Sequence, residues 1–220
     1  MNKENVLLSY PRSGNHLCRF FIELLSEIPT FGCKDNCKDI ELFKNTYTDI
    51  IPFNIKTNYD INYCFYKYHT INKNNNVNDL ILIIRNPLEI FARFYENLDT
   101  KLFDTYFDNI DYFNNFNGNK LLLYYEDIIT DKIDFINKLY DFLNINNIDK
   151  KNYVINNIDS LFSLCSKGSN RQWGGINSNF NIQFYYSKLS IDNKKDLDNY
   201  LKYKLINYKF IIDKYNITFV

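Results

Sequence analysis

The sequence predicts an α/β fold: a three-layer open sheet, mainly parallel, of four to five strands with helices on both faces. Short apolar runs alternate with amphipathic helical segments along the chain. One run, 80–84 (LILII), is apolar at every position, which is typical of a parallel strand covered on both faces. The chain has 220 residues without an internal repeat or a linker, so we expect a single domain over 1–220.

The first strand and the first helix are joined by a polar turn. Residues 5–10 (NVLLSY) are expected to form a short buried strand, and the apolar spacing of Leu17, Phe20 and Leu24 predicts a helix. The turn between them, 11–16 (PRSGNH), would face the first N–H groups of that helix, which have no acceptor within the helix. A turn of this kind can simply connect two elements, but arginine next to glycine at a helix N-terminus favours an anion site.

The later segments continue the alternation of strands and helices. Pro87 suits the first turn of a helix. Ligands of such sheets bind beyond the carboxyl ends of the strands. The expected elements are a helix over 36–50, a strand over 61–69, a loop over 72–78, a strand over 80–84, a broken helical stretch from about 88 towards 115, a strand over 121–124 and a helix over 131–143.

Polar residues follow each of the later strands. Lys67 and His69 are two residues apart in an extended segment, so their side chains should project from one face. Arg85 follows the next strand, and 125–127 (YED) follows the last one. A single histidine at a strand end is more often structural than catalytic. The ordered coincidence of four polar strand ends predicts a functional site at one edge of the sheet.

Charge and cysteine content exclude several classes of function. The 26 basic and 26 acidic residues cancel, so we expect no nucleic-acid partner and no membrane surface. We expect a cytoplasmic protein, since neither a signal peptide nor a long apolar segment is evident. Cys33 and Cys37 lack a second Cys/His pair at a zinc-like spacing, so we expect free thiols and no metal.

Four segments together resemble the sulfotransferases that use 3′-phosphoadenosine 5′-phosphosulfate (PAPS), whose fold is P-loop-like. YPRSGNHLCRFFIELL resembles their phosphosulfate loop, and LILIIRNPLEIFARFYE resembles their 3′-phosphate segment. YKYH resembles the K-T-H stretch of the cytosolic members, and LLLYYEDI resembles their strand ending in Y-E-D. All four occur in the order of the family, within residues 5 to about 145. The chain is similar to a short, divergent member.

The resemblance implies a role for each matching residue. Arg12 would contact the 5′-phosphate and the bridging oxygen, and Arg85 would bind the 3′-phosphate. Lys67 would contact the transferring sulfuryl group, and His69 would be the general base that takes the proton of the acceptor hydroxyl. The remaining nucleotide-binding residues would be Ser13, Gly14, Asn15 and His16 in the loop and Tyr125 near the base.

Two positions depart from the pattern of the family in its well-matched part. His16-Leu17 stand where Thr-Trp is usual, so an aromatic shelf for adenine is lost there. Arg93 stands where a serine usually follows the arginine by eight residues, so a guanidinium replaces a hydroxyl as the second partner of the 3′-phosphate.

The late R-K-G-x-x-G-x-W segment of the family fits in two registers. In one, Lys167-Gly168 and Trp173 match it, with Ser166 in place of the arginine. In the other, Arg171 matches with Gly174 and Gly175, and Tyr185 takes the place of a tryptophan. Ser190 is then expected to cap the last helix. Both registers remain open.

The resemblance implies sulfuryl transfer from PAPS to an acceptor hydroxyl by in-line displacement, releasing 3′-phosphoadenosine 5′-phosphate (PAP) without a metal. The acceptor would be a small molecule or a hydroxyl of a glycan or peptide. One alternative is a P-loop nucleotide kinase, although the G-x-x-x-x-G-K-[ST] signature is missing. Another is an inactive module that binds a nucleotide or a partner.

Overall fold

The structure is a computed structural model that describes residues 3–28, 30–31, 64–71, 75–94, 100–173 and 184–219. The chain divides into two compact units. The first consists of Met1–Ile84 and Thr105–Asn177, and the second of Arg85–Asp104 and Ser178–Val220. Folding of 1–220 as a single domain stays a prediction.

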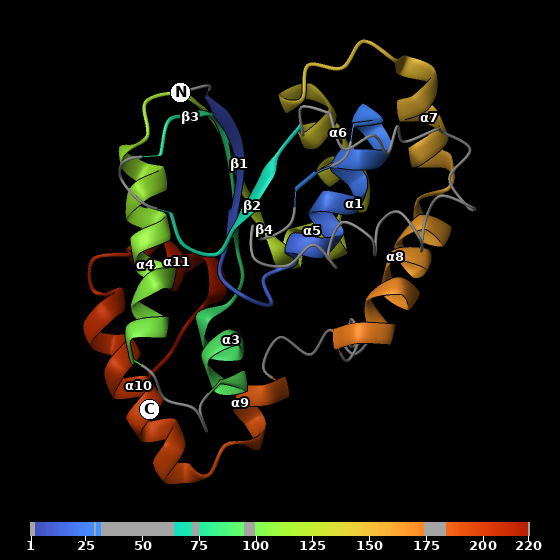
Figure 1. Cartoon of the computed structure of the whole chain (residues 1–220). Helices are drawn as coiled ribbons and strands as arrows, with labels where there is room; N and C mark the ends of the chain where they lie inside the picture. Colours follow the sequence, from blue (N-terminus) through green and yellow to red (C-terminus); the bar gives the residue numbers. More distant parts are fainter. Residues whose placement is uncertain are drawn as a thin grey trace. The chain divides into compact units, whose positions relative to one another are not determined.

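The first unit is built on a parallel sheet of four strands in the order β2-β1-β3-β4 (Figure 1). The register pairs Leu7 with Lys67 on one side and with Ile81 on the other. Because all strands run the same way, their carboxyl ends lie at one edge. The strands are β1 (Glu4–Ser9), β2 (Tyr66–Tyr68), β3 (Val77–Ile84) and β4 (Asn119–Tyr124).

Helices cover both faces of this sheet, with α1 and α6 on one side and α4 on the other (Figure 1). The predicted open α/β sheet is thereby confirmed. The helices that contribute to the first unit are α1 (Asn15–Ser26), α4 (Thr100–Asn115, from Thr105 onward), α5 (Tyr125–Thr130), α6 (Lys132–Phe142), α7 (Ile148–Asn156) and α8 (Ile158–Trp173). The second unit contains α3 (Pro87–Arg93), the start of α4, α9 (Phe184–Lys188), α10 (Ile191–Leu205) and α11 (Lys209–Tyr215).

Most predicted elements that fall on described residues are present. The broken helical stretch is α3 and α4, with Pro87 in the first turn, and Asp131 caps α6 by accepting from Asp134 N at 3.0 Å. Ser190 caps α10, but α11 follows, so α10 is not the last helix. The loop predicted over 72–78 was too long at its end, because Val77 already pairs with β1. The strand predicted over 61–69 is shorter, because β2 covers only Tyr66–Tyr68 of the described residues 64–69. The helix over 36–50 and residues 61–63 lie outside the described residues.

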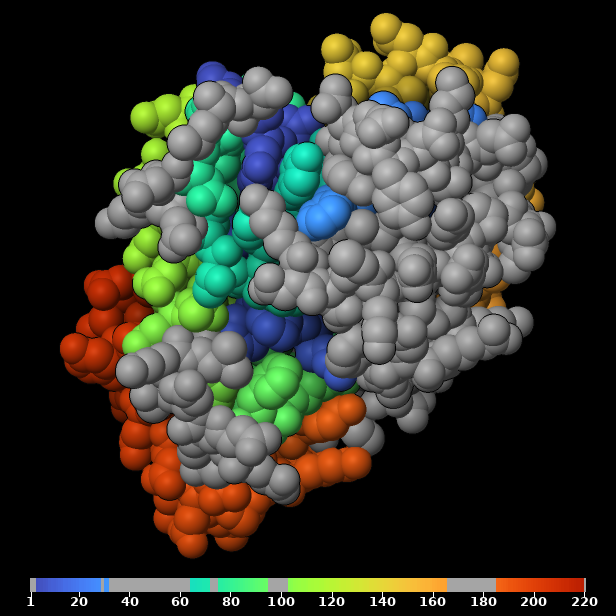
Figure 2. Space-filling view, in the orientation of Figure 1, coloured from blue at the N-terminus to red at the C-terminus, as the bar shows by residue number. Residues whose placement is uncertain are grey.

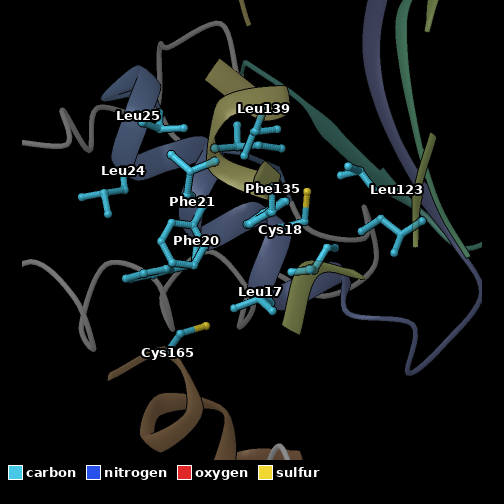
Figure 3. Close-up of a cluster of buried hydrophobic side chains, with 14 of the residues drawn as sticks. Leu17, Cys18, Phe20, Phe21, Leu24, Leu25, Leu123, Phe135, Leu139 and Cys165 are labelled. Carbon is cyan, nitrogen blue, oxygen red and sulfur yellow. The ribbon is translucent and has the colours of Figure 1, made fainter. Parts of the chain in front are cut away.

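One core cluster surrounds α1 and joins it to the sheet and to α6, α7 and α8 (Figure 3). Phe21 of α1 packs edge-on against Phe135 of α6 at 5.6 Å between ring centroids, and lies 4.8 Å from Phe162 of α8. Ile81 and Ile83 face this cluster. Leu8 and Leu82 alternate with the strand residues of the cluster and are also buried, although they do not belong to it. Both faces of the sheet are therefore covered.

The second unit has an aromatic core of its own. Phe91 of α3 stacks on Phe103 of α4 with ring centroids 4.3 Å apart, and Tyr200 of α10 packs against both rings. The Tyr200 hydroxyl donates to Asp104 Oδ1 at 3.0 Å, and Lys204 pairs with the same oxygen at 2.6 Å. These contacts join α3, α4 and α10 within the unit.

Candidate functional site

The turn after β1 has an unusual backbone. Ser13 N donates to Tyr10 O at 3.2 Å, which closes the turn. Arg12 and Gly14 both have left-handed backbone angles, with φ of 69° and 95°. Glycine adopts this conformation readily, whereas arginine does so at a cost of roughly 1–2 kcal/mol. The loop therefore stores strain at the residue predicted to contact the 5′-phosphate.

The Tyr125 ring packs directly against Gly14. A Cβ atom added to Gly14 would lie 2.5 Å from Cδ2 of the Tyr125 ring. Tyr125 begins α5, is 7% exposed and belongs to the core cluster, so its ring cannot easily yield. The close approach of loop and ring requires glycine at position 14.

The N-terminus of α1 leaves its first backbone N–H groups without a side-chain cap from the described residues. Cys18 N makes the first helical hydrogen bond, to Gly14 O at 3.0 Å. Within the described part of the chain, no side chain caps this terminus, and its first turn has no acidic residue. The buried Ser13 Oγ has no hydrogen-bond partner among the described residues. A buried hydroxyl that can donate, next to helix N–H groups, suits a phosphate or sulfate oxygen.

Asn15 supports the same loop from inside. Its Nδ2 donates to Ser9 Oγ at 2.9 Å, and the residue is 6% exposed. This bond ties the first turn of α1 to the last residue of β1. The Asn15 Oδ1 atom also has no hydrogen-bond donor among the described residues, but an anion has no proton to donate to it. Of these two buried oxygens, therefore, only Ser13 Oγ supports anion binding.

The end of β2 carries the second part of the site. Lys67 and His69 are half-buried, and the segments around β2 and β3, in teal, reach the surface in Figure 2. His69 Nδ1 lies 2.8 Å from Ser9 O. A carbonyl oxygen only accepts, so Nδ1 carries the proton, and in the neutral ring Nε2 holds the lone pair. Ser9 thus links His69 to the loop that follows β1.

A second polar cluster lies along α3 in the second unit. Asn86 caps this helix by accepting from Leu88 N at 3.0 Å. Glu89 Oε2 accepts from Tyr185 N at 2.8 Å, and Glu89 Oε1 lies 3.9 Å from an Arg85 guanidinium nitrogen. The Arg93 guanidinium stacks over the Tyr185 ring, 4.1 Å from its centroid.

The cluster has more positive than negative charge. Burial raises the pKa of Glu89, whereas the Tyr185 N–H and the two arginines act against that rise. Burial lowers the pKa of Arg93, and repulsion from Arg85 lowers it further. Among the described side chains of this cluster, two guanidinium groups lie near one buried carboxylate, and an anion would complement this excess of positive charge.

The predicted site residues are distributed over both units. Residues 12–16, Lys67, His69 and Tyr125 belong to the first unit, and Arg85 and Arg93 to the second. Lys167, Gly168 and Arg171 belong to α8, and Gly174 and Gly175 lie outside the described residues, so both registers remain open. The approach of Arg85 to Arg12 stays a prediction.

Sequence reasoning missed two buried polar residues that contact predicted site residues. Glu89 lies four residues from both Arg85 and Arg93, and this helical spacing could have revealed it. Asn109 of α4 donates to His69 O across 40 positions of sequence, and no local pattern signals such a contact.

The described residues bear on metal ligands, membrane-spanning helices and the state of the cysteines. Those residues include no group of three or more His, Cys, Asp or Glu side chains that could hold a metal ion. In the same ranges, no helix combines the length and the apolar character needed to cross a membrane. Cys18, Cys64 and Cys165 are free thiols, and Cys33 and Cys37 lie outside the described ranges.

The open parallel sheet with an uncapped helix after its first strand belongs to the α/β class, and solved structures define the fold more closely. Mouse sulfotransferase SULT7A1 complexed with PAP matches with a TM-score of 0.56 and 16% identity, over 92% of this chain and 84% of that one. Retinol dehydratase in a complex with retinol and PAP matches with a TM-score of 0.55 and 13% identity, over 92% and 81%. No protein-family model and no curated protein sequence matches the chain. The chain has the fold of the PAPS-dependent sulfotransferases.

Proposed function

We propose that the protein is a sulfotransferase that moves a sulfuryl group from PAPS to an acceptor hydroxyl and releases PAP. One observation carries this proposal: Ser9 joins an anion-binding helix terminus to a histidine whose Nε2 can accept a proton. An anion site next to a base is what transfer of a charged group to a hydroxyl requires. The fold shared with two PAP-bound structures supports the same conclusion.

The loop after β1 would hold the 5′ end of the nucleotide. The buried Ser13 hydroxyl, which has no hydrogen-bond partner among the described residues, fits a phosphate oxygen, and Gly14 lets the loop lie directly against the Tyr125 ring. Arg12 is exposed at the same turn and would add positive charge. PAPS supplies an activated sulfuryl group and a phosphate leaving group. The role of the chain is to align them and to stabilise the negative charge that develops.

The α3 cluster would hold the 3′-phosphate. A phosphate monoester carries about two negative charges at neutral pH. Arg85 and Arg93 together exceed the charge of Glu89, and Tyr185 orients the Arg93 guanidinium by stacking. We propose that a guanidinium pair does here what an arginine and a serine do in the family.

His69 would act as the general base. With Nδ1–H donating to Ser9 O, Nε2 would accept the proton of the acceptor hydroxyl as the hydroxyl oxygen bonds to sulfur. The bond between sulfur and the bridging oxygen of PAPS breaks at the same time, and PAP leaves with that oxygen. The carbonyl of Ser9 stabilises the imidazolium that results, and Lys67 adds positive charge near the transferring group. Proton transfer of this kind contributes ~10²–10⁴ in rate. We propose a small-molecule, glycan or peptide hydroxyl as acceptor.

The decisive test combines nucleotide binding with sulfate transfer. PAP and ATP are titrated by calorimetry, and transfer from labelled PAPS is measured to 4-nitrophenol, retinol, a monosaccharide and a tyrosine peptide. We expect PAP to bind without Mg²⁺, and His69→Ala to lower kcat by ~10²–10⁴ with little change in the Kd for PAP. Near-full activity of His69→Ala would remove the histidine from the mechanism.

Other results would favour the alternatives. Binding of ATP with Mg²⁺ and not of PAP would indicate a P-loop kinase. PAP binding without transfer to any acceptor in the panel would indicate an inactive nucleotide-binding module, which the unusual His16-Leu17 and Arg93 keep in consideration.

A further inference from the structure

Asn109 is a polar side chain among buried apolar neighbours on α4. The residue is 2% exposed, and Tyr106, Phe107 and Ile110 around it in sequence are also buried. Burying an amide is unfavourable unless the amide is hydrogen-bonded. The Asn109 Nδ2 donates to His69 O at 2.9 Å. This buried donor thereby holds the peptide group that follows β2.

His69 needs such a support because β2 is short. The ladder pairs Tyr66, Lys67 and Tyr68 with β1 and stops before His69. The backbone of His69 is therefore outside the sheet register. The bond from Asn109 to its carbonyl and the bond from its ring to Ser9 O hold the residue at two separate points.

These contacts are part of a set of three hydrogen bonds that connects four residues inside the first unit, through different atoms of His69 and of Ser9. It runs from Asn109 through His69 and Ser9 to Asn15, and so from α4 to the first turn of α1. Each link joins a different pair of elements. The orientation of the imidazole is thus tied to the helix terminus that we propose for the 5′ end of the nucleotide.

We propose that Asn109 is a positioning residue for His69. Its amide fixes the carbonyl at the end of β2, so that the ring keeps Nδ1 on Ser9 O and presents Nε2 to the acceptor hydroxyl. This inference rests on the proposed role of His69 as base. A small misplacement of a catalytic group can lower the rate by ~10²-fold, so loss of this one bond should be visible in kcat.

The test uses two substitutions of similar size. Asn109→Asp replaces the donor with a carboxylate that faces the carbonyl, and Asn109→Leu removes the donor without adding charge. Asn115→Asp is the matched control, because Asn115 lies on the same helix and its Nδ2 donates to Asp111 O at 2.8 Å on the exposed side. Thermal unfolding shows which variants fold, and Asn109→Leu keeps the experiment decisive if Asn109→Asp does not.

The readouts separate positioning from a purely structural role. They are kcat and KM for the best acceptor of the panel, the Kd for PAP, and the ring nitrogen shifts of His69 by ¹⁵N NMR. The chain has two histidines, so His16→Gln assigns the signals. We expect the Asn109 variants to lower kcat by ~10- to 100-fold, to leave the Kd for PAP unchanged, and to broaden or shift the His69 signals away from the Nδ1-protonated form.

The possible outcomes distinguish this inference from the proposed function. Wild-type His69 signals and wild-type kcat in a folded Asn109 variant would overturn the positioning role, even if its melting temperature falls. Absence of transfer by the wild-type chain would overturn the proposed function instead. The NMR shifts would then still decide whether Asn109 sets the His69 ring.

Discussion

Two helices that follow strand ends each carry a buried glutamate with an arginine four residues away, yet the two clusters differ in charge. On α1, Arg19 and Glu23 are both 2% exposed and meet at Thr30. Arg19 Nε donates to Thr30 Oγ1 at 2.7 Å, and Thr30 Oγ1 and N donate to Glu23 Oε1 at 2.5 and 2.8 Å. One guanidinium faces one carboxylate, and Thr30 joins them.

On α3, two arginines share one carboxylate. The Glu89 side chain is as buried as that of Glu23, but the Arg85 side chain is 15% exposed, and Arg93 stacks on Tyr185. Both clusters have the same helical spacing. We therefore base the different roles proposed for the two clusters on the number of guanidinium groups beside the carboxylate, and not on the presence of an Arg–Glu pair.

The largest expected contrast is between Arg19→Met and Arg85→Met. Arg19→Met leaves Glu23 buried without its guanidinium, so we expect the free energy of unfolding to fall by about 3–5 kcal/mol. Arg85→Met should cost much less stability, because Arg93 remains near Glu89, but should weaken PAP binding by ~10- to 100-fold. Urea unfolding and calorimetry measure the two effects. Equal losses of stability in both variants would contradict the comparison.

The pH dependence of stability tests the α1 cluster directly. Burial raises the pKa of Glu23 from 4.5 to about 7, against the opposing effects of Arg19 and Thr30. The folded chain therefore holds this proton more tightly than the unfolded chain. Protonated Glu23 therefore contributes about 3 kcal/mol to the free energy of unfolding. This contribution is fully present below pH 4.5 and is lost as the pH rises to about 7.

We expect Glu23→Gln to remove that slope in urea-unfolding series between pH 4.5 and 8. Because the pKa of Glu89 is also raised, Glu89→Gln should change the slope in the same direction. A slope that persists unchanged in Glu23→Gln would assign the titration to another group.

The loop after β1 would offer an anion backbone N–H groups together with the Ser13 hydroxyl, whereas the α3 cluster would offer side chains alone. Gly14→Ala places a Cβ against Tyr125 at a left-handed φ, so we expect a loss of about 1–3 kcal/mol in stability and weaker PAP binding. Gly118→Ala is the matched control. Its Cβ would lie 2.5 Å from the tip of the half-exposed Phe116 ring, which can move, and 3.0 Å from the backbone O of Asn78. PAP binding should be normal in the control, and a similar loss there would point to a general effect of alanine.

The smallest expected effect concerns Arg93 and its ligand selectivity. Arg93→Ser restores the residue usual in the family and removes one of the two guanidiniums. We expect PAP to bind ~10-fold more weakly, about 1.4 kcal/mol, whereas adenosine 5′-phosphate, which lacks the 3′-phosphate, binds as before. Arg93→Lys keeps the charge but loses the planar stacking on Tyr185, so its affinity for PAP should lie between those of the wild-type chain and Arg93→Ser. Equal weakening of both nucleotides would separate Arg93 from the 3′-phosphate.

Local patterns predicted much of the framework. The apolar run 80–84 forms the centre of β3, Pro87 opens α3, and the turn at 11–16 leads into an uncapped helix terminus. The loop over 72–78 was predicted too long because polar Asn76 and Asn78 do not show that Val77 pairs with β1. Such pairing depends on a strand distant in sequence.

The sequence by itself located the four strands, the helices α1, α3, α4 and α6, and the polar residues that follow the strands, but it did not predict α5, α7, α8, α9 or α11. Periodicity and turn chemistry are local properties, so they can be read without a partner. Only the tertiary structure decided that Asn109 supports His69, that Tyr125 lies beneath Gly14, and that Glu89 binds Tyr185 N. These contacts join residues far apart in sequence, and packing alone brings them within reach of one another.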